Sequence, residues 1–300
     1  AGGTTVLAGC TGDGGDGADG EESPAQSPSD DDTTARETGT DVETESESPT
    51  EPAEGTPEPS VDFEDDFEDG DYTENPAWEA DLGRTDGAAE IVSVSSPAGG
   101  NRGVQLTDVT DDRYQSPSIF KLADPMEGMD GEWTLSGLFS PVELPDDVDD
   151  RYIAVSLYWP HDGNFGNRAW LQFRFNQMDA SADGPAVRLR IQEQSNREWM
   201  IPAETSVSPL RTDQWYRWEL HHDGTGGYTA RRWPADGERS DGTELTTDFT
   251  APDAAVAFGL RTFTAVTNDD GSSAGEAGEK PYTVDHDYIR RTSGGTGAPE

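Results

Sequence analysis

Residues 170–176 read Trp-Leu-Gln-Phe-Arg-Phe-Asn, and this stretch decides the fold class. Its apolar positions alternate with other residues, which is the period of a β-strand with one buried face. These positions are Leu171, Phe173 and Phe175. A helix would instead need apolar residues three or four positions apart. The stretch therefore predicts a strand whose second face carries Trp170, Gln172 and Arg174.

The same two-residue period recurs through the chain from residue 61 to residue 293. Clear cases are residues 151–159, 187–191 and 215–220. Further strands are expected near residues 88–94, 103–109, 118–121, 132–140, 197–201, 228–233, 256–264 and 282–291. Asp-Gly pairs and other turn residues separate these ranges. The pattern predicts an all-β domain, built as a β-sandwich or jelly roll.

The charge of the chain is strongly negative and restricts its partners. Its 300 residues carry 62 acidic and 20 basic side chains, a formal net charge of -42. Nucleic acid is not expected as a partner, because phosphate binding needs a basic surface. Only two of the basic residues are lysines. An acidic, lysine-poor surface repels itself at low salt and is screened at molar salt, which indicates a protein from an extreme halophile.

The first ten residues indicate a lipid attachment site. They end in Leu-Ala-Gly-Cys, which resembles the processing site of prokaryotic lipoproteins, haloarchaeal ones included. Residues 1–10 are therefore expected to be the remnant of a lipoprotein signal, with the lipid on Cys10. This predicts a protein anchored at the extracellular face of the cytoplasmic membrane.

Residues 11–60 follow as a polar segment that contains no Phe, Trp, Tyr, Leu, Ile or Met. Residues 1–60 together hold 16 acidic residues and one arginine. Such a segment cannot bury apolar area, so we expect a disordered acidic linker that separates the anchor from the domain. Residues 294–300 are expected to be a flexible tail.

The order of several short motifs resembles a known superfamily. Residues 63–71 read Phe-Glu-Asp-Asp-Phe-Glu-Asp-Gly-Asp and are followed by Trp78. Later motifs are Gly-Val-Gln-Leu at 103–106, Glu-Trp-Thr-Leu at 132–135, Asp-Gln-Trp-Tyr at 213–216 and Val-Asp-His-Asp-Tyr at 284–288. Residues 61–293 are similar to the concanavalin A-like lectin/glucanase superfamily, in its laminin-G-like branch. The resemblance implies a jelly roll, a fold that hosts many functions.

The resemblance also implies a structural calcium ion between the opening and closing strands. The matching residues are Asp66, Asp69, Asp71 and Asp287. Calcium prefers six to eight oxygen ligands, which clustered aspartates supply in part. The alternative is a hydrated acidic run without a metal.

Residues 159–170 hold the best candidates for carbohydrate binding, because aromatic rings and polar side chains are concentrated between two strands. The candidates are Trp159, His161, Asn164, Asn167, Trp170, Gln172, Arg174, Arg188 and Arg190. Arginines on such a face favour uronic or sulfated glycans. The alternatives are ordinary packing for the two tryptophans and ion pairing for the arginines.

The sequence was also searched for a catalytic motif of the glucanases in this superfamily. The strand Glu-x-Asp-x-x-Glu of the superfamily's glucanases is absent from the sequence, so no catalytic residue is predicted. We therefore expect a non-catalytic lipoprotein that binds a glycan or another cell-surface partner. A divergent polysaccharide hydrolase or lyase is the first alternative, and a structural or adhesion domain without a sugar site is the second.

Overall fold

The computed structural model describes residues 60–81, 87–109, 118–144, 150–159, 169–177, 184–192, 199–252, 256–265 and 281–294. All of them belong to one compact unit, Gly55–Glu300. The lipid site at Cys10, the linker up to residue 59 and the tail from residue 295 lie outside the described residues. The predictions made for these segments stay predictions.

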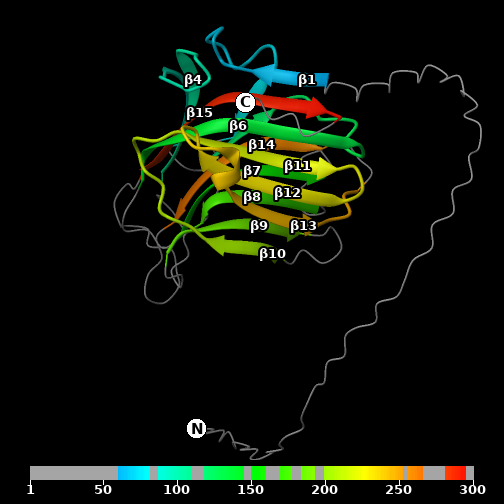
Figure 1. Cartoon of the computed structure of the whole chain (residues 1–300). Helices are drawn as coiled ribbons and strands as arrows, with labels where there is room; N and C mark the ends of the chain where they lie inside the picture. The colour runs from blue at the N-terminus through cyan, green and yellow to red at the C-terminus, as the bar shows by residue number, and fades with distance from the viewer. Residues whose placement is uncertain are drawn as a thin grey trace, which may run out of the picture. The chain divides into compact units, whose positions relative to one another are not determined.

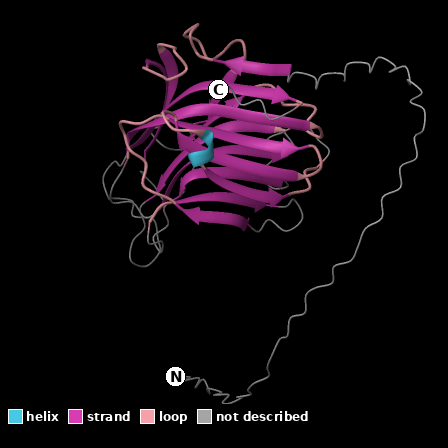
Figure 2. Ribbon diagram, viewed as in Figure 1, coloured by secondary structure: helices cyan, strands magenta, loops and turns pink. Residues whose placement is uncertain are grey.

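The described residues form strands joined by loops, with one short helical turn, η2 (Arg239–Asp241) (Figure 2). The first strands are β1 (Ser60–Asp65), β2 (Trp78–Asp81), β3 (Ala88–Ser93), β4 (Arg102–Val109), β5 (Ser118–Leu122), β6 (Glu132–Glu143), β7 (Asp150–Trp159) and β8 (Ala169–Gln177). The others are β9 (Ala186–Gln192), β10 (Trp199–Ser206), β11 (Tyr216–Asp223), β12 (Gly227–Pro234), β13 (Thr243–Asp248), β14 (Ala257–Ala265) and β15 (Pro281–Ser293). Within these ranges, no helix has the length and apolar character needed to cross a membrane.

The strands form two antiparallel sheets (Figure 1). One sheet has eight strands. Seven follow the order β13-β12-β11-β6-β15-β4-β3, and β1 pairs with the C-terminal part of β15. The other has seven strands in the order β10-β9-β8-β7-β14-β5-β2. Neighbours in each sheet are often distant in sequence, as β14 is from β5, so the topology is that of a jelly roll and not of a meander.

A single large apolar core lies between the sheets. In the seven-stranded sheet, Val155 pairs with Phe173, and Phe173 pairs with Leu189, so three neighbouring strands point apolar side chains inward in one row. The two sheets meet directly where the rings of Phe139 on β6 and Phe175 on β8 stack with centroids 4.8 Å apart. Burial of this apolar area is the main force that holds the sandwich together.

The structure confirms the predicted fold class. Each predicted strand overlaps a strand of the structure, with ends displaced by up to a few residues. The alternation did not reveal β1, β2 or β13. All three are short and lie at sheet edges, where Glu64, Glu79 and Glu244 weaken the apolar pattern.

Candidate functional site

The outer face of the seven-stranded sheet carries an unusual number of cations. We call it the arginine face and define it by Arg174, Arg188, Arg190 and Arg261. In one cross-strand row, Arg261 pairs with Ala154, Ala154 with Arg174, and Arg174 with Arg188. Arg190 lies in the next row, opposite Gln172. Like charges directly opposite each other are unfavourable in a sheet, so this row needs negatively charged or hydrogen-bond-accepting groups around it.

A hydrogen-bonded chain fixes the centre of this face. The guanidinium of Arg174 donates to Gln172 Oε1 from Nη2 at 3.1 Å and from Nε at 3.3 Å. Gln172 Nε2 in turn donates to Ser156 Oγ at 3.1 Å. Arg174 Cζ also lies 3.6 Å from the centroid of the Tyr152 ring, which is a close cation–π contact. These contacts hold the Arg174 side chain in one orientation.

Arg261 is the least satisfied cation of the arginine face. Its Cζ lies 5.2 Å from the centroid of Trp170, whose ring packs against Tyr158 with centroids 5.2 Å apart. The side chain is 7% exposed, yet Arg261 forms no hydrogen bond or ion pair with any residue that the structure describes. A buried cation is normally paired with an anion, so this position favours a negatively charged group from elsewhere.

Acidic residues on the same face lie away from its centre. Glu79 on β2 is paired with Lys121 at 2.9 Å, and Glu204 on β10 is paired with Arg188. The strand pairing also places Asp81, two residues after Glu79, and Asp150, at the start of β7, on this face. Glu79 and Glu204 lie on the two edge strands, six strand spacings of about 4.8 Å apart, whereas a glycosidase needs carboxylates about 5–9.5 Å apart. These two ion-paired glutamates therefore do not form a glycosidase pair.

Burial varies across the face. Trp170, Gln172 and Arg174 are buried, while Arg188 and Arg190 on β9 are half-buried. The margin along β9 is therefore the more accessible part of the arginine face.

The structure separates the two tryptophans predicted to share a site. Trp159 is 1% exposed and packs in the core against Phe249, with ring centroids 5.6 Å apart. Trp170 lies on the opposite face, because its partner Tyr158 is one residue before Trp159. The two rings therefore do not line one groove. His161, Asn164 and Asn167 lie outside the described residues.

The other predicted binding residues do come together. Trp170, Gln172, Arg174, Arg188 and Arg190 lie on neighbouring strands of one face. Sequence reasoning missed three of their neighbours, which are Tyr152, Ser156 and Arg261. The alternation within residues 151–159 and 256–264 predicts on which side of its strand each side chain lies. It does not predict which strands are neighbours, and only the strand order brings these three side chains to the same site.

The four aspartates predicted to bind calcium do not form a metal site. Among the described residues, no three His, Cys, Asp or Glu side chains are arranged to hold a metal ion. Asp66 and Asp69 instead accept backbone hydrogen bonds from Glu68 and Asp71, each two residues ahead, as in Asx turns. Asp287 is buried, and this burial raises its pKa, which weakens it as a ligand. The geometry does not support this calcium site.

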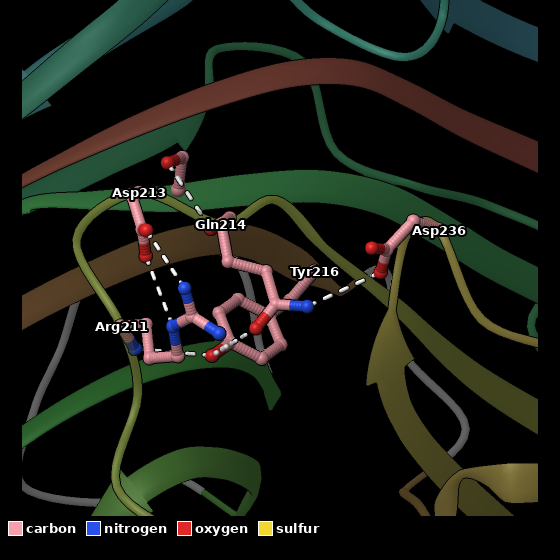
Figure 3. A network of polar contacts seen from close by, with 6 residues as sticks. Arg211, Asp213, Gln214, Tyr216 and Asp236 are labelled. Atoms are coloured by element: carbon pink, nitrogen blue, oxygen red, sulfur yellow. Dashed lines mark hydrogen bonds and ion pairs between the residues drawn. The ribbon is translucent and has the colours of Figure 1, made fainter.

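A second polar cluster has a structural role (Figure 3). Arg211 donates to both carboxylate oxygens of Asp213, at 3.0 and 2.7 Å. The Tyr216 hydroxyl accepts from the Arg211 backbone and donates to Gln214, which donates to Asp236 at 3.1 Å. These side chains satisfy one another and fix the loop before β11 to the turn after β12.

Comparisons with known proteins place the fold in a class. The chain matches no protein family model and no curated protein sequence. Among solved structures, it is similar to an endo-β-1,4-glucuronan lyase from the fungus Trichoderma reesei, with 15% identity and a TM-score of 0.52. That match covers 78% of this chain and 96% of the lyase. The domain thus has the concanavalin A-like jelly-roll fold.

Lectins are also found among the structural neighbours. Peanut lectin matches with 14% identity and a TM-score of 0.48, over 80% of this chain and all of the lectin. The carbohydrate recognition domain of Emp47p matches with 11% identity and a TM-score of 0.48, over 79% and 97% of the two chains. At these identities the similarity concerns the fold.

Proposed function

We propose that this domain binds an acidic polysaccharide, one that carries uronic acid or sulfate groups, on the arginine face. The observation that carries the proposal is Arg261, a buried guanidinium without an ion-pair partner among the described residues. A ligand carboxylate or sulfate would supply the missing anion and accept two parallel hydrogen bonds. It would also relieve the repulsion between Arg174 and Arg188 across their strands.

The neighbouring side chains differ in how accessible they are to a ligand. Trp170 and Tyr158 are buried beside Arg261, and Gln172 and Ser156 are buried beneath the face, so these side chains position the cations, while the half-buried Arg188 and Arg190 are the accessible groups for a ligand. The half-buried margin at Arg188 and Arg190 gives a longer chain a path along β9. The proposal of carbohydrate binding thus rests on the positive charge of this face and on its accessible part along β9.

A glycan-array screen at molar salt tests the proposal, with Arg261→Met beside the wild type. We expect acidic glycans to bind and neutral ones not to bind. Arg261→Met should weaken binding by at least about tenfold, because a hydrogen bond to a charged group contributes about 1.5–3 kcal/mol. The ligand-free variant should be at least as stable as the wild type, because the substitution removes an unpaired buried charge.

Arg217→Met is the matched control, because Arg217 is a half-buried arginine on the other sheet. It should leave glycan binding unchanged. If Arg261→Met binds acidic glycans as tightly as the wild type, Arg261 does not bind the anionic group. Absence of binding to every acidic glycan would overturn the proposal and favour a structural or adhesion domain.

Polysaccharide β-elimination is a second candidate, favoured by the position of Tyr152. Its ring lies under Arg174, which is bonded to Gln172, so a tyrosine packs against a guanidinium that could hold a uronate carboxylate. In the reaction a base removes the proton at C5, the C4–O bond breaks, and the C4=C5 bond forms as the leaving oxygen is protonated. Tyr152→Phe should then retain binding and abolish the ultraviolet absorbance of the unsaturated product. If the wild type produces no such absorbance with any glycan that it binds, lyase activity is excluded for those glycans and the binding function is retained.

The cellular setting is part of the same proposal. We infer a lipoprotein attached through Cys10 at the outer face of the membrane, with residues 11–60 as a linker to the domain. The Leu-Ala-Gly-Cys motif and the absence of large apolar residues after it support this. Cys10→Ser should release the protein into the medium, and undiminished membrane retention would contradict the anchor.

A further inference from the structure

A pocket of about 590 Å³ opens among the loops that join the strands. It is lined by residues 127–130, by the β11–β12 turn at 224–226 and by residues 249–252, together with Trp159 and His222. A volume of this size accommodates a small organic molecule. Because Trp159 points to the inner side of the seven-stranded sheet, the pocket is separate from the arginine face.

The wall formed by residues 127–130 is held in place from several sides. Arg291 Nη2 donates to the carbonyl of Gly128 at 3.2 Å, and Trp133 Nε1 donates to the carbonyl of Met129 at 3.1 Å. Just before this wall, Met126 and Val256 exchange backbone hydrogen bonds of 2.9 and 3.1 Å. The pocket is therefore largely pre-formed, which lowers the cost of ordering a ligand site.

His222 gives the pocket a defined polar group. Its side chain is 5% exposed, and Nδ1 lies 2.7 Å from the carbonyl of Gly131. A carbonyl only accepts, so Nδ1 is the ring nitrogen that donates to Gly131, and Nε2 is the ring nitrogen left for a ligand. The stacked Trp133 ring fixes the orientation, with centroids 5.5 Å apart. Nε2 has no partner among the described residues, although His222 lines the pocket.

The charged lining of the pocket is negative. Glu127 and Asp130 are exposed at its rim, and neither forms an ion pair with a described residue. None of the lining residues is an arginine or a lysine. The described residues also lack a cluster of three His, Cys, Asp or Glu suited to a metal ion. A hydrogen-bond donor on a ligand suits His222 Nε2, and a positive charge on the ligand gains most from the two carboxylates.

We infer that this pocket binds a small hydroxylated amine of the amino-sugar class. The ammonium group lies between the Glu127 and Asp130 carboxylates, and a hydroxyl donates to His222 Nε2. This ligand is opposite in charge to the one proposed for the arginine face, so the two proposals stand or fall separately.

Calorimetric titration of the full chain with glucosamine tests the inference, at a pH that keeps the amine protonated. Glucose is the uncharged control ligand. We expect glucosamine to bind at least about tenfold more tightly, since only it forms charge-assisted hydrogen bonds with the carboxylates. Glu127→Gln and Asp130→Asn should each reduce this preference without affecting folding, because both side chains are exposed.

His222→Asn separates ligand contact from structure. The asparagine amide can still donate to the Gly131 carbonyl from the position of Nδ1, but it offers nothing at the position of Nε2. Binding of glucosamine should fall in a variant that melts like the wild type, while Glu238→Gln, an exposed substitution outside the pocket, should bind normally. Equal affinity for glucose and glucosamine, no binding of either, or full affinity in His222→Asn would each overturn the inference.

Discussion

His286 is the most unusual single residue of the core. It is fully buried on β15, and neither ring nitrogen has a hydrogen-bond partner among the described residues. Burial lowers its pKa from 6.5 to about 3, so the folded protein holds a neutral imidazole. The unfolded chain binds a proton at higher pH than the folded chain does. The free energy of unfolding should therefore fall as the pH drops from 6.5 toward 3, by up to about 1.4 kcal/mol per pH unit.

Urea denaturation of wild type and His286→Leu across this pH range measures the effect. The leucine is similar in volume and cannot be protonated, so the stability of the variant should depend less on pH below 6.5. His221→Gln is the control, because His221 is a half-buried histidine whose Nδ1 lies 3.1 Å from Thr134 Oγ1. Parallel pH profiles for wild type and His286→Leu would show that His286 is not the group responsible.

Asp65 is a second buried titratable residue, and its effect on the pH dependence of stability is opposite to that of His286. Its carboxylate accepts from Trp78 Nε1 at 2.6 Å and from the Phe67 backbone at 2.9 Å, and burial raises its pKa to about 6. The folded state thus binds a proton more readily than the unfolded state, and stability from this group is lost as the pH rises from 3.8 to 6. Asp65→Ala should destabilise the domain by about 1–3 kcal/mol even at neutral pH, because the buried indole N–H loses its acceptor.

Thermal melts of Asp65→Ala and of the exposed control Asp62→Ala, each beside the wild type, separate this effect from general charge removal. Asp62 interacts with Arg291 at 3.1 Å but accepts no buried indole. A melting temperature in Asp65→Ala equal to that of Asp62→Ala would contradict the role given to the Trp78 hydrogen bond.

At the scale of the strands, β4 and β15 approach each other closely at Gly103. A Cβ atom at this position would lie 2.6 Å from the backbone carbonyl oxygen of His286. Backbone cannot rotate away as a side chain can, so Gly103→Ala should separate the two strands and cost about 1–3 kcal/mol. Gly184→Ala is the control, since a Cβ there meets nothing within 4 Å. Equal melting temperatures for the two variants would contradict the close approach.

Alternation along single strands accounts for what could be predicted from the sequence. It assigned Phe173 to the core and Arg174 to the opposite face, because a side chain on a strand has only two directions. It could not give the strand order, which depends on contacts between distant segments. Arg261 and Arg174 are 87 positions apart and share a row only because β14 lies beside β7. For this reason the sequence predicted Arg174 and its neighbours on β8 and β9 as site residues but did not predict Arg261.

Two expectations for the site gain no support from the structure, for related reasons. Trp159 and Trp170 looked like one site because both flank the same loop in the sequence, yet their strand positions differ by one in register and their side chains oppose each other. Asp66, Asp69 and Asp71 were predicted as metal ligands, but short carboxylates near a turn are readily satisfied by the backbone N–H two residues ahead.

At the scale of the whole molecule, net charge dominates the response to salt. A chain of charge -42 repels itself, and molar salt shortens the Debye length to about 3 Å. Exposed ion pairs such as Arg211–Asp213 are weakened as well, but such pairs contribute only about 0–1 kcal/mol each. The melting temperature should therefore be higher in 3 M than in 0.1 M potassium chloride, concentrations chosen roughly from these screening lengths. Sucrose at equal osmolality is the uncharged control, and a lower melting temperature at high salt would contradict the halophile inference.

Binding of an acidic glycan has to survive the same salt. An exposed arginine would lose most of its attraction for a carboxylate at molar salt, whereas a buried pair is screened much less. Arg261 is 7% exposed, and Arg188 is half-buried at the β9 margin. Between low and high salt, the contribution of Arg261, measured as the affinity ratio of wild type to Arg261→Met, should thus change less than that of Arg188→Met. If the Arg261 ratio fell as steeply with salt as the Arg188 ratio, the anion would be held at the accessible margin and not at the buried guanidinium.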